Sequence, residues 1–130
     1  MDLNDTVVHD GLNAIETTIG ASPSLLIFSG AKPADCTDAD PAGLLATLTL
    51  PADWLANAAA RAKTLLGTWS VAASGGAGAT PASWRIKVGA TCYVQGSAGI
   101  GSGELSFDGT ITAGQTVTVT AFTLTDGNPA

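Results

Sequence analysis

Basic side chains are scarce in this sequence. Lysine and arginine together number 5, against 11 aspartate and glutamate residues, so the formal net charge is −6. Proteins that bind nucleic acid neutralise backbone phosphates with clustered lysine and arginine, and five dispersed basic residues cannot form such a cluster. We therefore expect neither nucleic acid nor an anionic membrane as a partner. A basic protein surface fits this charge, because opposite charges favour encounter and fix register.

Side chains suited to catalysis are equally few. His9 is the only histidine, and the sequence around it predicts a helix with no nucleophile beside it. Ser29 and Ser74 each precede a glycine in a turn and lack the strand-to-helix setting of a nucleophile elbow. Nothing marks Glu104 and Asp108 as the tuned carboxylate pair of a glycosidase. We therefore expect a protein that is not an enzyme and that uses no cofactor.

Cysteines and long apolar runs are also rare. Cys36 and Cys92 lack the close paired spacing of a zinc or redox motif. The start of the sequence has no basic region followed by an apolar run of signal length, and the apolar stretch 25–28 is too short to span a membrane. We expect a protein kept inside the cell, with free thiols, although the two cysteines could meet in space. We also expect folding without a disulfide or a metal.

Charged residues make up only 12% of the chain, whereas surfaces of free monomers carry about a quarter or more. Alanine, glycine, threonine and serine dominate instead. Two explanations stay open. The composition reflects an alanine-rich genome, or partners cover much of the surface.

The segment 30–43 contains the turn-forming residues of a loop and is acidic. Asp35, Asp38 and Asp40 are oxygen donors that could surround a calcium ion. The glycine and the closing glutamate of an EF-hand are missing at the required spacing. We expect a solvated acidic loop that holds no metal.

One amphipathic helix is predicted over residues 5–19. Val8, Leu12, Ile15 and Ile19 recur at helical spacing and form a single apolar stripe. Asn4 or Asp5 can cap the first turn, and Gly20 can end the helix.

Alternating and short apolar runs predict a mainly β fold after this helix. Threonine alternates with apolar residues near the end of the chain, as expected for a strand with one buried face. Gly89-Ala90 suits a type II′ hairpin turn, which needs a positive φ at its first central residue. The predicted strands are 24–29, 44–50, 64–73, 84–88, 91–95, 104–107 and 114–125.

This pattern predicts an antiparallel β-sandwich, jelly-roll-like, with one N-terminal amphipathic helix. We expect one domain over 1–130, with 1–20 as the helix or an arm and 24–125 as the sandwich. The last five residues are expected to fray. The segment 52–62 is ambiguous, and its alanines favour one or two helical turns.

The three tryptophans are expected to differ in role. Trp69 and Trp84 fall in predicted strands and are assigned to the core. Trp54 follows a proline that ends a strand and precedes an alanine string, so we expect it to be exposed and to anchor an interface. Exposed tryptophans would also suit a carbohydrate-binding module.

The chain resembles a family of small structural proteins of tailed-phage and prophage virions. The resemblance rests on an opening helix rich in leucine, asparagine and aspartate that ends in 19–21, and on the segments 25–33, 44–54, 67–70 and 114–119. These features are spread over nearly the whole chain. It implies a non-enzymatic particle component, located in the virion and assembled in the host cytoplasm. No functional residue is carried over from the family.

The function expected from these observations is that of a capsid decoration or cement protein, which binds and stabilises the assembled head shell. The expected partners are the major capsid protein and further copies of the chain, with a trimer favoured. Alternatives are a neck or tail component and a carbohydrate-binding receptor module. The interface residues expected are Trp54, Leu55, Lys32, Asp38 and Asp40.

Overall fold

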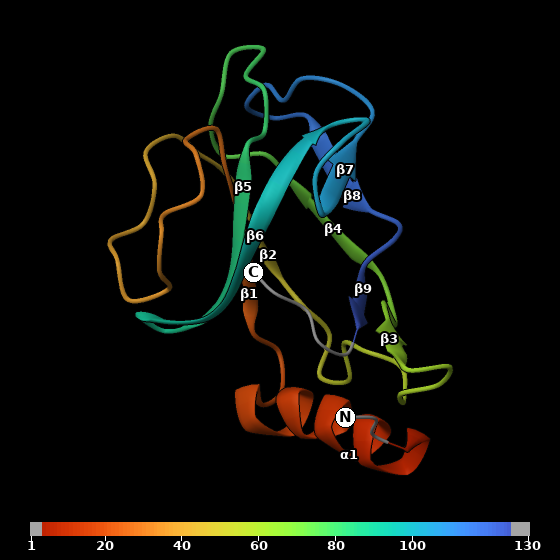
Figure 1. Ribbon diagram of the computed structural model, residues 1–130. Helices are drawn as coiled ribbons and strands as arrows, with labels where there is room; N and C mark the ends of the chain where they lie inside the picture. Colours follow the sequence, from red (N-terminus) through yellow and green to blue (C-terminus); the bar gives the residue numbers. More distant parts are fainter. Residues whose placement is uncertain (1–3, 126–130) are drawn as a thin grey trace.

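The fold is mainly β with one N-terminal helix, as the computed structural model shows for residues 4–125 (Figure 1). The predicted fraying of the last five residues lies outside this described range. The elements are α1 (Asp5–Ile19), β1 (Ser24–Phe28), β2 (Leu44–Thr49), β3 (Ala62–Thr64), β4 (Trp69–Ala72), β5 (Ser83–Val88), β6 (Thr91–Ile100), β7 (Leu105–Phe107), β8 (Thr116–Val119) and β9 (Thr123–Thr125).

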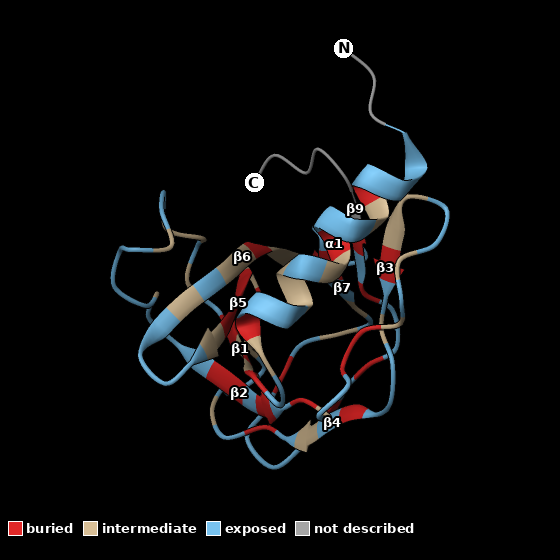
Figure 2. Cartoon of the chain, turned by 90° about the horizontal axis from the view of Figure 1, so that it is seen from below, coloured by how far each residue is buried: buried red, intermediate tan, exposed pale blue. Residues whose placement is uncertain are grey.

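Helix α1 confirms the prediction made from the apolar stripe. Asn4 caps it, since its Oδ1 accepts from the N–H of Val7 at 2.9 Å. Gly20 ends it with φ 94°, where its N–H donates to the carbonyl of Glu16. Val8, Leu12 and Ile19 are buried. Figure 2 shows the opposite face of the helix exposed, so α1 packs on the body through one stripe.

The largest sheet is a curled half-barrel with the strand order β2-β1-β5-β6-β7. Four of its strands pair antiparallel, but β6 and β7 pair in parallel, so the prediction of a wholly antiparallel arrangement is wrong at this edge. The segment 101–104 brings the chain back along β6, so that Leu105 lies opposite Ala98 and β7 then runs in the same direction as β6. Gly103 has φ 84°, and a Cβ there would lie 2.8 Å from the carbonyl carbon of Ala98, so this reversal requires glycine.

The β5–β6 hairpin confirms the predicted turn. Gly89 has φ 58°, while Ala90 is not among the residues with positive φ. This combination is the one that a type II′ turn requires. The strand after the turn runs on to Ile100, beyond the predicted end at residue 95.

Two small sheets complete the described part, β3 with β9 and β4 with β8. The predicted strands 64–73 and 114–125 are each interrupted, which sequence alternation did not reveal. Phe122 lies at the interruption in the second of them and is buried against Trp69 and Trp84, with ring centroids 5.3 Å apart in both pairs. The chain leaves the β8 ladder there to bring this ring into the core.

The prediction of helical turns within 52–62 is wrong. This segment is irregular and extended, with a bridge between Leu55 and Leu65. Ala60 and Arg61 have positive φ values of 49° and 60° and form the turn that brings Ala59 opposite Ala62. The helix propensity of the alanines is overridden here, because Trp54 and Leu55 are buried in the core and hold the chain in an extended conformation.

All three tryptophans belong to that core. Trp69 and Trp84 are 1% and 3% exposed, which confirms their assignment. Trp54 is also only 1% exposed, so the expectation that it reaches out from the surface is wrong. Its ring lies 6.2 Å from that of Trp69, and its Nε1 donates to the carbonyl of Gly20 at 3.0 Å. That bond secures the end of α1 and accounts for the burial.

Candidate functional site

The loop 31–43 joins β1 to β2 (Figure 1) and lies against the part of the large sheet formed by β5 and β6. Most of its residues are exposed. Two backbone bonds close its base, from Ser29 N–H to the carbonyl of Gly43 at 2.9 Å and from Gly30 N–H to that of Ala42 at 3.0 Å. We refer to residues 31–43 as the acidic loop.

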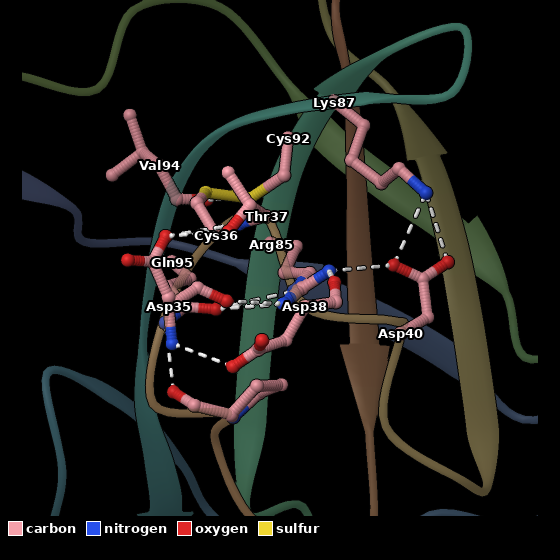
Figure 3. The surroundings of a disulfide bond; sticks show 11 residues. Asp35, Cys36, Thr37, Asp38, Asp40, Arg85, Lys87, Cys92, Val94 and Gln95 are labelled. Atoms are coloured by element: carbon pink, nitrogen blue, oxygen red, sulfur yellow. Dashed lines mark hydrogen bonds and ion pairs between the residues drawn. A yellow bond between two sulfur atoms is a disulfide. The ribbon is translucent and has the colours of Figure 1, made fainter.

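Arg85 holds the acidic loop from below. It lies on β5 and is 2% exposed, yet its guanidinium finds acceptors throughout (Figure 3). Its Nη1 donates to the carbonyl of Asp38 at 2.9 Å and to Oδ1 of Asp40 at 3.0 Å, and its Nη2 donates to the carbonyl of Asp35 at 3.1 Å. Gln95 on β6 accepts from Nε and Nη2. The planar fork of arginine suits this multiple contact.

Gln95 contributes a second link between the sheet and the loop. Its Nε2 donates to the carbonyl of Pro33 at 2.8 Å, while its Oε1 accepts from Arg85. Neither Arg85 nor Gln95 was predicted from the sequence to belong to the site. The available signal was the alternation of Arg85 and Lys87 on one face of a strand whose other face is apolar, in a chain with few bases and an acidic loop.

Lys87 continues the ionic contact toward solvent. Its Nζ lies 2.8 Å from Oδ2 of Asp40, whose Oδ1 also faces Arg85 (Figure 3). The hydrogen bond from Lys87 lowers the pKa of Asp40 below its ordinary value, and the bond from Arg85 acts in the same direction. Asp40 therefore stays ionised and ties the end of the loop to β5.

Asp35 and Asp38 shape the loop internally. Oδ1 of Asp35 accepts from the N–H of Thr37 at 3.0 Å, and this bond lowers the pKa of Asp35. Oδ2 of Asp38 accepts from the N–H of Asp35 at 3.0 Å. Within residues 4–125, no group of three or more His, Cys, Asp or Glu is arranged to hold a metal ion. The three aspartates thus organise the backbone of the loop.

A disulfide between Cys36 and Cys92 joins the acidic loop to β6 (Figure 3). Their Cα atoms lie 5.5 Å apart, inside the usual range for a disulfide, and the bond links residues 56 positions apart. The expectation of free thiols is therefore wrong. Spacing gave no indication of this pair, because the cysteines meet only through the fold of β5 and β6.

The disulfide and the charged groups line a pocket of about 440 Å³ between the loop and the hairpin turn. Arg85 forms part of its wall, but its donors already face acceptors of the protein. The pocket therefore offers no free guanidinium for an anionic ligand. What the site presents outward is a fixed loop with exposed side chains, since its carbonyls of Pro33, Asp35 and Asp38 are turned to the sheet.

The expected interface residues separate into two groups. Asp38 and Asp40 come together at the acidic loop, and Lys32 lies at its start, half-buried. Trp54 and Leu55 are each 1% exposed and belong to the hydrophobic core, so they do not belong to this surface. Burial of all three tryptophans also removes the exposed rings on which a sugar-binding role depended.

The remaining residues weighed for chemistry take part in local structure. His9 accepts at Nε2 from the N–H of Arg61 at 3.0 Å. Oε1 of Glu104 accepts from the N–H of Ser97 at 3.1 Å, so this carboxylate helps to close the reversal between β6 and β7. No helix in the described part of the chain is both long and apolar enough to cross a membrane.

No protein-family model, no curated protein and no solved structure matches the chain.

Proposed function

We propose that the chain is a non-enzymatic structural protein of a tailed-phage virion, a capsid decoration or cement protein that binds the assembled head shell. The observation that carries the proposal is the acidic loop, which is exposed yet held by a disulfide, by Arg85 and by the Lys87–Asp40 ion pair. A preorganised loop loses less conformational entropy when it binds a partner. The loop is thus built for contact with a basic protein surface.

The mechanism is mass action. A protein that binds only the assembled lattice stabilises that lattice by its binding free energy. The major capsid protein is the proposed partner, and the surface of the chain, poor in charge, suits coverage by neighbouring subunits. The finer fold proposed for this role is a jelly-roll-like sandwich, in which the small sheets form a second layer against the large one.

The disulfide is compatible with a virion location. Disulfides are rare in a reducing cytoplasm but persist on particles and cell surfaces. Assembly in the host cytoplasm followed by release would leave Cys36 and Cys92 to be oxidised in the particle.

The test is co-sedimentation of the purified protein with empty head shells of the phage that encodes it. Asp38→Asn keeps an oxygen that can accept from the N–H of Asp35 but removes an exposed charge. It should weaken shell binding about fivefold, as expected for an exposed ion pair of about 1 kcal/mol. Asp10→Asn also removes an exposed charge, from α1, and serves as the matched control, with no expected effect.

Equal binding by both variants would remove the acidic loop from the interface, and failure of the wild-type protein to sediment with shells would overturn the proposal. Electron microscopy of the particle distinguishes a decoration protein from the alternative, a neck or tail component. Copies spread over the head support decoration, whereas a single ring at the tail vertex supports the alternative.

Self-association as a trimer is part of the same proposal, since closed symmetry is the rule for homo-oligomers. Sedimentation equilibrium should show a trimer in solution or on the shell. A monomer in both states would contradict it.

A further inference from the structure

The large sheet and the β4–β8 sheet each end at a free edge, and these edges face one cavity. Among residues 4–125, β7 pairs only with β6, and β8 pairs only with β4. A cavity of about 620 Å³ lies between them. Ser106, Phe107 and Asp108 line one side, and Thr116, Thr118 and Thr120 line the other.

The hydrogen-bond phase directs the backbone of β8 toward this cavity. Ala73 N–H donates to the carbonyl of Gln115, which makes that pair a hydrogen-bonded one. Since such pairs alternate along an antiparallel ladder, Thr116 and Thr118 fall at the non-bonded pairs and direct their N–H and C=O away from β4. The hydroxyls of Ser70 and Thr118 lie 3.0 Å apart, in agreement with the closer side chains of a non-bonded pair.

The same reasoning applies to β7. The carbonyl of Phe107 accepts from Gly101 N–H, so Phe107 directs its backbone groups toward β6. Ser106 therefore directs its own N–H and C=O to the opposite side. In the described part of the chain, the outward N–H and C=O groups of Ser106, Thr116 and Thr118 have no hydrogen-bond partner.

The side chains on the two strands alternate in the same sense. Leu105, Val117 and Val119 are buried, whereas Ser106 and Thr118 are exposed. A strand residue in a packed sheet occupies about 160 Å³ at the usual spacings, so the cavity has room for about four residues. A strand with apolar and hydroxyl residues in alternation would continue the layer from β7 to β8.

Two of the features that protect free strand edges are absent here, although both strands are short. Lysine and proline are the usual means of preventing edge pairing, and neither occurs in 104–108 or 115–120. The cavity lining carries the carboxylate of Asp108 and no basic residue. A ligand that complements it therefore brings a positive charge.

We propose that the slot between β7 and β8 accepts one extended peptide segment of a partner protein by β-strand addition on both edges. The segment alternates β-branched apolar residues with hydroxyl residues and carries a lysine or arginine beside Asp108. Main-chain hydrogen bonds to Ser106, Thr116 and Thr118 provide affinity, and the basic residue fixes direction. This inference does not depend on the identity of the partner proposed above.

The probe is the synthetic peptide acetyl-Lys-Thr-Val-Thr-Val-Thr-Lys-amide, and the readout is hydrogen exchange at single amides together with binding by titration calorimetry. We expect the peptide to slow exchange of the Ser106, Thr116 and Thr118 amides about tenfold or more. N-methylation of the peptide on its valine amides, or on its threonine amides, should weaken binding about tenfold in each case, because each removes the donors of one edge. Loss in only one of the two would show pairing with a single edge and overturn the slot.

Thr118→Pro removes the outward N–H and no backbone bond to β4, but it also removes the hydroxyl contact with Ser70. It should abolish binding, whereas Thr118→Val, which loses the same hydroxyl and keeps the N–H, should bind as the wild type does. Equal melting temperatures of the two variants establish that the fold is kept. Should Thr118→Pro not fold, Ser106→Pro and the methylated peptides carry the same test. Peptide binding by Thr118→Pro at wild-type affinity, no protection at millimolar peptide, or the same protection caused by raising protein concentration alone would each overturn the proposal.

Discussion

The acidic loop and the segment 53–61 are both irregular, yet they are secured by opposite chemistry. The acidic loop supplies hydrogen-bond acceptors and the large sheet supplies the donors, because Arg85 on β5 donates to the carbonyls of Asp35 and Asp38. In the segment 53–61 the backbone donates and α1 accepts. The first arrangement leaves the side chains of the loop exposed, while the second buries Trp54 and Leu55.

The contacts of the segment 53–61 recur along the helix. Glu16, Asn13 and His9 accept in turn from the backbone N–H groups of Leu55, Ala58 and Arg61, at 3.1, 3.0 and 3.0 Å. These acceptors lie at helical spacing on one flank of α1, and the donors are three residues apart. Side chains of a helix thus replace the ladder partner that an extended segment otherwise needs.

This difference indicates what each region does. A segment held through its N–H groups with its large side chains buried joins the helix to the body. A loop held through its carbonyls with its side chains outside presents a surface.

Trp54→Ala should lower the free energy of unfolding by about 3–5 kcal/mol, the usual loss for a buried aromatic ring. The change removes the contact with Trp69 and the bond to the carbonyl of Gly20. Urea denaturation measures it. Trp54→Phe should lose less, since it retains a ring against Trp69. An unchanged urea midpoint for Trp54→Ala would contradict the burial of Trp54 and its role in attaching this segment to the core.

Arg85→Lys should cost about 3 kcal/mol, because a buried acceptor set is left without its partner and an ammonium cannot reproduce the fork. Lys87→Arg is the matched control on the same strand face, and its effect should stay below about 1 kcal/mol since it preserves the outer ion pair. The same denaturation series measures both. A loss of stability for Arg85→Lys as small as that for Lys87→Arg would show that a positive charge at residue 85 suffices and that the guanidinium fork is not needed.

Asn13→Ala should cost about 1–3 kcal/mol, because it removes the acceptor of Ala58 N–H and leaves the buried Lys63 ammonium with Glu16 alone. Oδ1 of Asn13 accepts from Ala58 N–H at 3.0 Å and from Nζ of Lys63 at 2.7 Å, and Lys63 is only 1% exposed. Asn13→Asp keeps an acceptor and should recover most of the loss in thermal unfolding. Equal losses in both variants would argue against acceptance by the helix as the means of attachment.

Asp53→Asn should produce the smallest effect, a gain in stability that appears only above pH 4 or so. The hydrogen bond shared with Glu16 raises the pKa of Asp53, and the charge of Glu16 adds to the shift. A raised pKa means that the folded state retains a proton that the unfolded state releases. The free energy of unfolding of the wild type therefore falls as pH rises above 3.8, the ordinary value. Melting curves of the two proteins should coincide at pH 3 and separate toward neutrality, whereas a constant offset would contradict this.

Sequence patterns predicted the elements whose stability is local. The helix 5–19 follows from its stripe and caps, and the β5–β6 turn follows from Gly89. Sequence patterns failed where contacts between residues far apart in the sequence determine the local conformation. The segment 53–61 departs from its alanine propensity because α1 satisfies its backbone, and β6 pairs in parallel with β7 because glycines permit a short reversal.

The candidate site was predicted in part. The acidic loop and the positions of Asp38 and Asp40 within it were evident from composition. Its fixed conformation was not, because it depends on Arg85, Gln95 and Cys92, which lie on strands far along the chain. Trp54 was misassigned since its partners, Gly20 and Trp69, lie 34 and 15 positions away.

The most direct measurement is hydrogen exchange at single amides before and after reduction of the Cys36–Cys92 disulfide with dithiothreitol. With the bond intact, the amides of Asp35, Thr37 and Asp38 and those of Leu55, Ala58 and Arg61 should all be protected. Reduction should speed exchange in the first set about tenfold or more and leave the second set unchanged. Acidic-loop amides that exchange at unstructured rates while the disulfide is intact, or two sets that accelerate together, would contradict the separate attachment of the two regions.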